Sequence, residues 1–233
     1  MLIRTPADAI LRGVALSLNL AALTDEELHL LYGDERALAV LPEVSRARLS
    51  RRPEPGPALP ASLEFRPLAE RLWGATPEQS RLLSALDQSL GASGAAALSA
   101  VAWAEEPSGD YLMPYLLPPD TATLLRWNET AGTPGAVLEA LTWLRDQASG
   151  FSGVLTTSRL RATVPAPSEE IDVHHHPGLS TGELLEAHAG YVLRHGRTQK
   201  RSADADWWAP WQQLYALNLT AWERRGLLLQ RPG

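Results

Sequence analysis

The sequence predicts an α+β fold: a mostly helical single domain over residues 1–233, with a few short strands that form a small sheet. Helix-start signals are the first observation behind this prediction. Thr24 and Ser180 each stand three residues before a glutamate, as in a capping box, while Thr76 and Thr133 each precede a proline. The second observation is that leucines recur every three to four residues after these signals, which is typical of helices with one buried face.

The expected elements follow from these patterns along the chain. Apolar residues at every second position from 14 to 20 predict a first strand. β-Branched residues predict one strand or a tight pair of strands within 153–164, and alternation predicts another strand over 171–176. Helices are expected over 24–33, 34–41, 76–90, 119–128, 135–148, 180–195 and 211–225. The last of these carries tryptophans at helical spacing, so we expect it to be buried in the core.

Two proline-rich segments are expected to lack regular structure. Residues 42–60 hold five prolines and four arginines, which predicts a Pro/Arg-rich surface loop at 42–60. Pro42 is expected to end the helix before it. The prolines of residues 108–120 exclude a central strand there, because proline cannot donate to a sheet ladder.

Five of the six histidines lie between residues 169 and 197, which makes this stretch the first candidate site. Histidine is a common metal ligand and titrates near neutral pH. The strand expected at 171–176 points His174 and His176 to the same side. His188 and His195 fall on or beside the buried stripe of the following helix. The alternative interpretation is a polar turn before a capped helix, with His188 and His195 hydrogen-bonded at the edge of the core.

The pattern His174-x-His176-Pro177, followed by Ser180-x-x-Glu183, resembles the JAMM metalloproteases. The resemblance implies a zinc-dependent hydrolase in which His174, His176 and Glu183 bind the metal. It also implies that Ser180 stabilises the oxyanion, with His188 and His195 as associated polar groups. This chain departs from the family in its shorter spacer, in glutamate where the family has aspartate, and in lacking an evident upstream glutamate.

A second candidate site combines cations with tryptophan. Arg194, Arg197, Lys200 and Arg201 precede Trp207 and Trp208 closely along the chain. Cations that neutralise phosphates beside aromatic rings that stack on bases are typical of single-stranded nucleic-acid binding. An aromatic stripe at helical spacing is equally the signature of a buried core, which is the alternative interpretation.

Composition excludes several classes. The net charge of −6 argues against general affinity for duplex nucleic acid. The chain contains no cysteine, so a disulfide framework, a thiol nucleophile and a cysteine-based zinc site are excluded. The apolar run near the start is interrupted by polar residues, and no stretch reaches the length needed to span a membrane. We therefore expect a cytoplasmic protein without a membrane partner.

One family resemblance rests on the order of the parts. A strand leads into a Thr-Asp-Glu-Glu-Leu helix at 14–30, a short aromatic helix is expected at 65–73, a Gly-Asp-Tyr to Pro-Pro-Asp passage occupies 109–120, and a helical pair closes the chain. This order resembles the YfbM-like family of small bacterial proteins over about half the chain. The resemblance implies a single α+β domain and no particular activity.

The sequence as a whole leads to a soluble, non-catalytic binding or interaction protein. It has no nucleophile elbow, phosphate loop or paired acids that would indicate an enzyme. No cofactor is expected in this interpretation. Zinc belongs only to the hydrolase alternative, and the expected partner is another protein or a second copy of the chain.

Overall fold

The architecture is that of a computed structural model with two compact units. The structure describes residues 15–68, 74–98, 102–104, 111–129, 135–146, 149–201 and 208–231. Unit 1 comprises Met1–Leu63, Thr163–Pro167 and Tyr215–Gly233, and unit 2 comprises Glu64–Ala162 and Ser168–Leu214. The prediction of one domain over the whole chain stays a prediction. None of the described helices is both long and apolar enough to cross a membrane.

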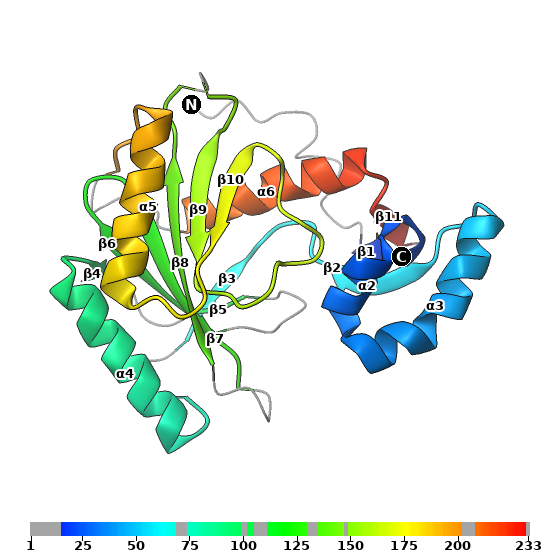
Figure 1. Ribbon diagram of the computed structural model, residues 1–233, viewed down its shortest axis with the longest axis horizontal. Helices are drawn as coiled ribbons and strands as arrows, with labels where there is room; N and C mark the ends of the chain where they lie inside the picture. Colours follow the sequence, from blue (N-terminus) through cyan, green and yellow to red (C-terminus); the bar gives the residue numbers. More distant parts are fainter. Residues whose placement is uncertain are drawn as a thin grey trace. The chain divides into compact units, whose positions relative to one another are not determined.

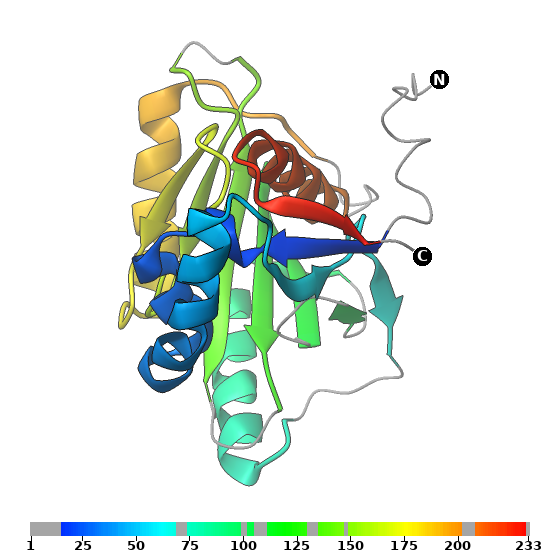
Figure 2. The same ribbon diagram turned by 90° about the vertical axis from the view of Figure 1, so that its right-hand side faces the viewer.

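Unit 1 is built on a three-stranded antiparallel sheet in the order β11-β1-β2, seen in Figure 2. Its elements are β1 (Ala15–Asn19), η1 (Leu20–Ala22), α2 (Asp25–Tyr32), α3 (Asp34–Leu49), β2 (Pro55–Leu59) and β11 (Leu228–Arg231). The predicted first strand is confirmed as β1. The predicted capping box is also confirmed: Thr24 accepts from the Glu27 N–H, and the Glu27 carboxylate accepts from the Thr24 N–H.

The helix predicted to begin at Asp34 is confirmed as α3, but the predictions for residues 42–60 are wrong. A helix was expected to stop at Pro42 and a surface loop to follow, but α3 continues through Pro42 to Leu49, and β2 occupies part of the remainder. Proline removes the hydrogen bond to the carbonyl four residues earlier, that of Leu38. Leu38 lies on the exposed side of the helix, so water can satisfy this carbonyl.

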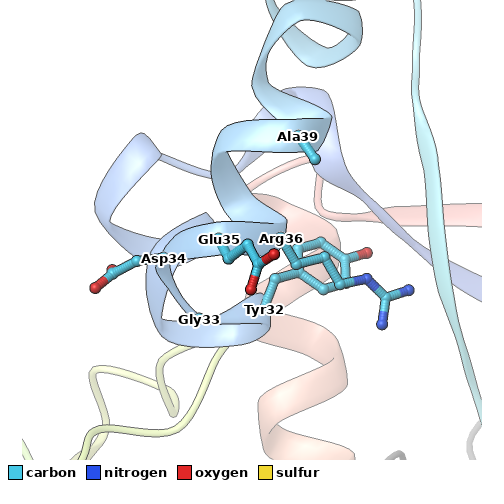
Figure 3. Close-up of a pocket in the computed structure, with 6 residues that line it drawn as sticks. All are labelled: Tyr32, Gly33, Asp34, Glu35, Arg36 and Ala39. Carbon is cyan, nitrogen blue, oxygen red and sulfur yellow. The ribbon is translucent and has the colours of Figure 1, made fainter.

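A surface pocket of about 380 Å³ lies where α2 meets α3 (Figure 3). Gly33 joins the two helices with a φ of 76°, a conformation that glycine adopts without strain. The Arg36 guanidinium lies 4.9 Å from the centre of the Tyr32 ring. The pocket therefore has an aromatic and cationic wall at the start of α3, with Glu35 and Ala39 also lining it.

Unit 2 contains an eight-stranded sheet in the order β10-β9-β8-β7-β6-β5-β3, with β4 also paired to β6. All of its pairs are antiparallel except β9 with β10. Its elements are β3 (Phe65–Pro67), α4 (Pro77–Ala92), β4 (Ala96–Ala97), β5 (Ala102–Ala104), β6 (Tyr111–Leu117), β7 (Thr121–Trp127), β8 (Ala136–Trp143), β9 (Gly153–Thr157), β10 (Ile171–His175) and α5 (Thr181–His195). The aromatic helix expected at 65–73 is wrong at its start, where β3 lies, and residues 69–73 are outside the described part of the chain.

The predicted fold class is wrong in its proportions. Helices hold 40% and strands 28% of the described residues, so the protein is α+β but not mostly helical with a small sheet. Residues 119–128 and 135–148 were expected to be helical, whereas β7 and β8 occupy most of them. The threonine and proline at 133–134, which suggested a helix start, lie outside the described residues.

The exclusion of a central strand from residues 108–120 is also wrong, because β6 lies between β7 and the β4 and β5 strands. The Pro114 carbonyl accepts from the Leu98 N–H, so the Pro114 nitrogen faces that side and not β7. β4 pairs with residues 115 and 116 and β5 with residues 111 and 112, which leaves Pro114 at the break between the two ladders. Proline is tolerated there because the missing N–H falls in this break.

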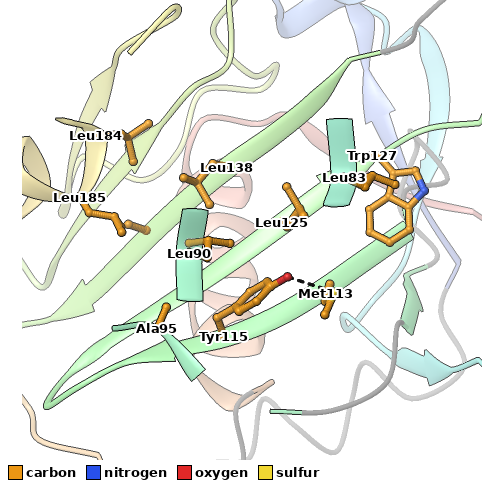
Figure 4. Packing of buried hydrophobic residues seen from close by; sticks show 11 residues of the cluster. Leu83, Leu90, Ala95, Met113, Tyr115, Leu125, Trp127, Leu138, Leu184 and Leu185 are labelled. Atoms are coloured by element: carbon orange, nitrogen blue, oxygen red, sulfur yellow. Dashed lines mark hydrogen bonds between the residues drawn. The ribbon is translucent and has the colours of Figure 1, made fainter. Parts of the chain in front are cut away.

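Helices α4 and α5 cover one face of the large sheet, as Figure 1 shows. Leu83 and Leu90 of α4 and Leu184 and Leu185 of α5 belong to one buried cluster with side chains of β6, β7 and β8 (Figure 4). Both helix starts were predicted correctly. Thr76 accepts from the Gln79 N–H at α4, and Ser180 forms a capping box with Glu183 at α5.

The tryptophan-rich last helix is confirmed as α6 (Ala209–Arg224). The division between the two units falls within this helix, after Leu214. In unit 2, the Trp143 ring nitrogen donates to the Pro210 carbonyl. Trp143 lies on the sheet face opposite α4 and α5, because side chains alternate along β8 and the α4/α5 cluster takes Leu138 and Ala140. In unit 1, Trp222 donates to the Ala166 carbonyl.

Candidate functional site

The predicted histidine stretch folds as an edge strand, β10, followed by α5. β9 hydrogen-bonds to β10 in a parallel register, and the predicted strand is therefore confirmed. His188 of α5 is 1% exposed, and its two ring nitrogens each lie 2.9 Å from a threonine hydroxyl, Thr142 on β8 and Thr156 on β9. His188 was expected at the edge of the core, but it lies inside the core. There its two hydrogen bonds connect α5 to the sheet.

Two other histidines converge on one carboxylate. The His195 Nε2 lies 2.7 Å from the Asp172 Oδ2, and the His174 Nε2 lies 2.8 Å from the same oxygen. The His195 contact is a directed hydrogen bond, whereas the His174 contact lacks hydrogen-bond geometry. Burial alone would raise the pKa of Asp172, but the two imidazoles outweigh it and hold that pKa below its ordinary value.

Tyr191 joins the remaining rings of this cluster. His174 stacks on the Tyr191 ring with centroids 3.5 Å apart, and the Arg194 guanidinium lies 4.9 Å from the same ring centre. The His176 Nε2 lies 2.7 Å from the Tyr191 hydroxyl. The rings therefore form a polar aromatic row that holds β10 against α5.

The predicted zinc ligands are not brought together. His174 and His176 both contact Tyr191, but the Glu183 carboxylate accepts from the Ser180 N–H and hydroxyl in the helix cap. These bonds hold the pKa of Glu183 below its ordinary value. Within the described parts of the chain, no group of three or more histidine, aspartate or glutamate side chains is arranged to hold a metal ion.

A glutamate on β8, Glu139, is held in a buried ion network. Glu139 is 6% exposed and lies 2.8 Å from the Arg159 Nε and 3.4 Å from the Arg126 Nε. Burial alone would raise the pKa of Glu139, but the two guanidinium charges lower it below the ordinary value. Glu139 is therefore an ion-pair acceptor within the sheet.

A basic pocket of about 530 Å³ begins at the end of α5. We use the name basic pocket for this cavity and the six residues that line it: Arg145, Gly196, Arg197, Thr198, Gln199 and Lys200. Three of its six lining residues are cationic, and none carries a carboxylate. The Asp146 carboxylate is the nearby counter-charge, 4.0 Å from where a Cβ on Gly196 would stand.

The chain segment that supplies most of this lining is anchored on both sides. The Arg145 N–H donates to the Arg197 carbonyl, and the Gln199 N–H donates to the Trp143 carbonyl, so the segment runs antiparallel to the end of β8. The Gln199 side chain donates to the Leu144 carbonyl. The cations of the basic pocket therefore project from a backbone that is already held in place.

The chain turns out of α5 at Gly196, whose φ is 102°, so a side chain at this position would be strained. The Thr198 hydroxyl donates to the Asp120 carboxylate, and the Arg201 N–H donates to the Pro119 carbonyl. These bonds tie residues 196–201 to the turn between β6 and β7. The shape of the basic pocket thus depends on the end of α5, the end of β8 and the turn between β6 and β7.

The residues predicted to bind nucleic acid are not gathered at one site. Arg201 is bonded through its N–H to the Pro119 carbonyl. Arg197 and Lys200 line the basic pocket, whereas Arg194 lies over Tyr191. Trp208 is stacked on Phe65 with ring centroids 4.2 Å apart, so one of its faces is already covered. Trp207 lies outside the described residues.

Arg145 was missed at the sequence level. It was assigned to the expected helix at 135–148 and stood apart from the basic run after Gly196. The run of cations without acids from residue 194 to 201 was the available signal, and only the pairing of this run with β8 adds Arg145 to it.

Comparison of the chain with protein-family models, with curated proteins and with solved structures found no match. The resemblances to the JAMM metalloproteases and to the YfbM-like family therefore stay predictions.

Proposed function

We propose that this protein is a non-catalytic binding protein for a small phosphate-bearing ligand, which the basic pocket holds. The observation that carries the proposal is the set of three cations, Arg145, Arg197 and Lys200, around one cavity. Guanidinium groups bind phosphate oxygens through paired hydrogen bonds, and an ammonium adds a point charge. The whole chain has a net charge of −6, so this local concentration of cations stands out against an acidic background.

The size of the basic pocket supports a small ligand. Its volume of about 530 Å³ lies within the range of roughly 300–1,000 Å³ that small-molecule sites occupy. A single strand of nucleic acid would also need exposed aromatic faces along its path. Trp208, the described member of the predicted stacking pair, already stacks on Phe65. The geometry thus favours a phosphorylated small molecule over a nucleic-acid strand.

The lining supports binding rather than catalysis. Its polar uncharged side chains are already engaged: the Thr198 hydroxyl with Asp120 and the Gln199 amide with the Leu144 carbonyl. The remaining polar side chains, those of Arg145, Arg197 and Lys200, donate hydrogen bonds and accept none. The basic pocket is suited to neutralising an anion, and its lining supplies no general base.

Isothermal titration calorimetry with inorganic phosphate and pyrophosphate tests the proposal. We expect both anions to bind, and Arg197→Ala to weaken binding by roughly 10-fold to 100-fold, the worth of a charged hydrogen bond. Arg161→Ala is the matched control, because Arg161 is exposed and does not line the basic pocket. Equal losses in the two variants, or no binding of either anion, would show that the basic pocket is not an anion site.

A labelled oligothymidine distinguishes the nucleic-acid alternative. Affinity that grows with strand length, exceeds that for pyrophosphate and falls steeply with salt would replace the small-ligand proposal with single-strand binding. For the zinc alternative, the thermal unfolding temperature is compared with and without EDTA. We expect no change, because Glu183 is engaged by Ser180. A zinc content near one equivalent, lost in His174→Ala, would instead support the hydrolase.

A further inference from the structure

Helix α3 exposes leucine on a side that unit 1 does not use. Its inner side carries Ala37 and Val44, both fully buried. Leu38 and Leu49 are instead 62% and 87% exposed, and an exposed proline and an exposed serine lie between them on the same side. These four residues, at spacings of four, three and four, form what we call the outer stripe: Leu38, Pro42, Ser45 and Leu49.

Spacings of this kind place all four side chains of the outer stripe on one line along a helix. At about 100° per residue, this line lies roughly 120° around the helix from the inner side. The Arg48 guanidinium marks the inner side, because it donates to the Asp25 carboxylate and to the Leu23 carbonyl. The outer stripe therefore faces away from the contacts that hold α3 in unit 1.

The composition of the outer stripe suits contact with another helix. The outer stripe has an exposed leucine at each end and no charged side chain between them on that line, so pairing it with another helix would remove apolar surface from water. Pro42 and Ser45, in the middle, are short side chains that let a second helix approach closely. The leucines at the two ends can then reach across to the partner.

The two ends of α3 are complementary to each other in shape. The pocket of about 380 Å³ at the α2–α3 junction lies at the beginning of the helix, where Glu35, Arg36 and Ala39 line it (Figure 3). Leu49, the most exposed of the large apolar side chains described, projects at the other end. A projecting side chain and a pocket at opposite ends of one helix match when two copies of the helix lie antiparallel.

Charge is arranged in the same way. Asp34 and Glu35 stand at the beginning of α3 beside one cation, Arg36, whose guanidinium lies over the Tyr32 ring. The last turn carries Arg46 and Arg48, with Arg51 and Arg52 just beyond it. In an antiparallel pair, the acidic end of each helix meets the basic end of the other. A two-fold interface requires this self-complementarity, because each patch must contact its counterpart on the same surface of the second copy. A partner of another kind would need neither match.

We propose that the outer stripe is a homodimer interface, in which α3 pairs antiparallel with α3 of a second copy of this chain. The two-fold axis passes near the middle of the helix. In this register Leu38 faces Leu49 of the second copy, and Pro42 faces Ser45. Leu49 packs beside the pocket at the start of the opposing helix, and Glu35 meets the arginines at its end. The interface shares no residue with the basic pocket.

The absence of cysteine from the chain makes an engineered cysteine a unique reporter of this register. With a rise of about 1.5 Å per residue, Ser45 of one copy lies only about 4–5 Å along the axis from Ser45 of the other. For helix axes about 8 Å apart, the two Cα atoms are then roughly 6 Å apart, a separation that a disulfide spans.

Ser45→Cys is therefore expected to form an intermolecular disulfide on mild oxidation, and it replaces only the side-chain oxygen by sulfur. Leu49→Cys is the matched control, because its two copies stand roughly 16 Å apart along the axis. Both positions are exposed on the same line of α3, so they differ in register and not in access to the oxidant.

Light scattering at protein concentrations up to about 0.5 mM gives the oligomeric state, since an interface of one helix pair belongs to the small class. We expect a dimer, and we expect Leu38→Glu with Leu49→Glu to weaken it by at least about 100-fold. Leu160→Glu, at an exposed leucine of unit 2, is expected to leave the dimer unchanged. Circular dichroism checks that each variant is folded.

Three results would overturn the proposal. The first is a monomer throughout the concentration range. The second is a dimer that survives the double glutamate variant with its folding intact. The third is cross-linking of Leu49→Cys as fast as that of Ser45→Cys, which would mean random collision or another register.

Discussion

Acidification is expected to loosen the attachment of α5 to the sheet through His188. Burial is the main reason why the pKa of His188 is lowered from 6.5 to about 4, and the charge of His174 adds to it. The neutral ring fits the site, since its two nitrogens bind the hydroxyls of Thr142 and Thr156. A proton on this ring would place a charge where the side chain is 1% exposed.

The direction of the change in stability with pH follows from the protonation of His188 in the folded and unfolded states. Above pH 6.5 the ring is neutral in both, so the stability is fully present. As the pH falls from 6.5 towards 4, His188 becomes protonated in the unfolded chain but stays neutral in the folded chain, so the free energy of unfolding decreases. With about 1.4 kcal/mol per pKa unit, the expected loss between pH 7 and pH 4.5 is about 2–3 kcal/mol.

Urea unfolding followed by tryptophan fluorescence at pH 7, 5.5 and 4.5 measures this loss. The comparison is with His188→Gln, which keeps hydrogen-bonding groups but does not titrate. We expect the variant to be less stable than the wild type at pH 7 and the difference to shrink as the pH falls. A difference that stays constant over this range would refute the assignment of a neutral, buried His188.

Three further predictions concern the folding of the two units. Glu139→Gln removes the buried carboxylate of the ion network and is expected to lower the free energy of unfolding in urea by about 3–5 kcal/mol. Glu78→Gln, which breaks an exposed ion pair, is the control. Equal effects of the two substitutions would contradict the argument from burial. Thr76→Ala removes the cap of α4 and is expected to cost about 1 kcal/mol, while Thr76→Ser restores most of it. Pro42→Ala allows the hydrogen bond to the Leu38 carbonyl and is expected to stabilise α3 by about 1–2 kcal/mol; a lower unfolding temperature would show that proline fits this helix better than alanine.

The largest errors of the sequence prediction fall on strands that are buried on both faces. Every residue of β7 is buried, and so are the last six residues of β8. Such strands carry apolar side chains on both faces and lose the alternation that identifies a half-buried strand. Their leucines then match helical spacing by chance. β1 and β10, whose apolar and polar residues alternate, were predicted correctly.

The candidate site shows the same limit. The run of cations after Gly196 was visible in the sequence, but Arg145 joins it only through the pairing of residues 197–199 with the end of β8. The convergence of His195 and His174 on Asp172 was equally hidden, because the contact between His195 and Asp172 joins a helix end to an edge strand. Each of these contacts depends on register between elements, which local patterns do not encode.

The sequence by itself determined the features that arise within one turn of chain. The caps at Thr24, Thr76 and Ser180 are bonds between near neighbours, and the alternation in β1 and β10 and the helical spacing of the α6 tryptophans are patterns of neighbouring positions. Tertiary structure alone decided the eight-stranded sheet, the continuation of α3 through Pro42 and the lining of the basic pocket. The physical reason is that these depend on which surfaces are buried against each other, and burial between distant segments outweighs the local preferences of any one of them.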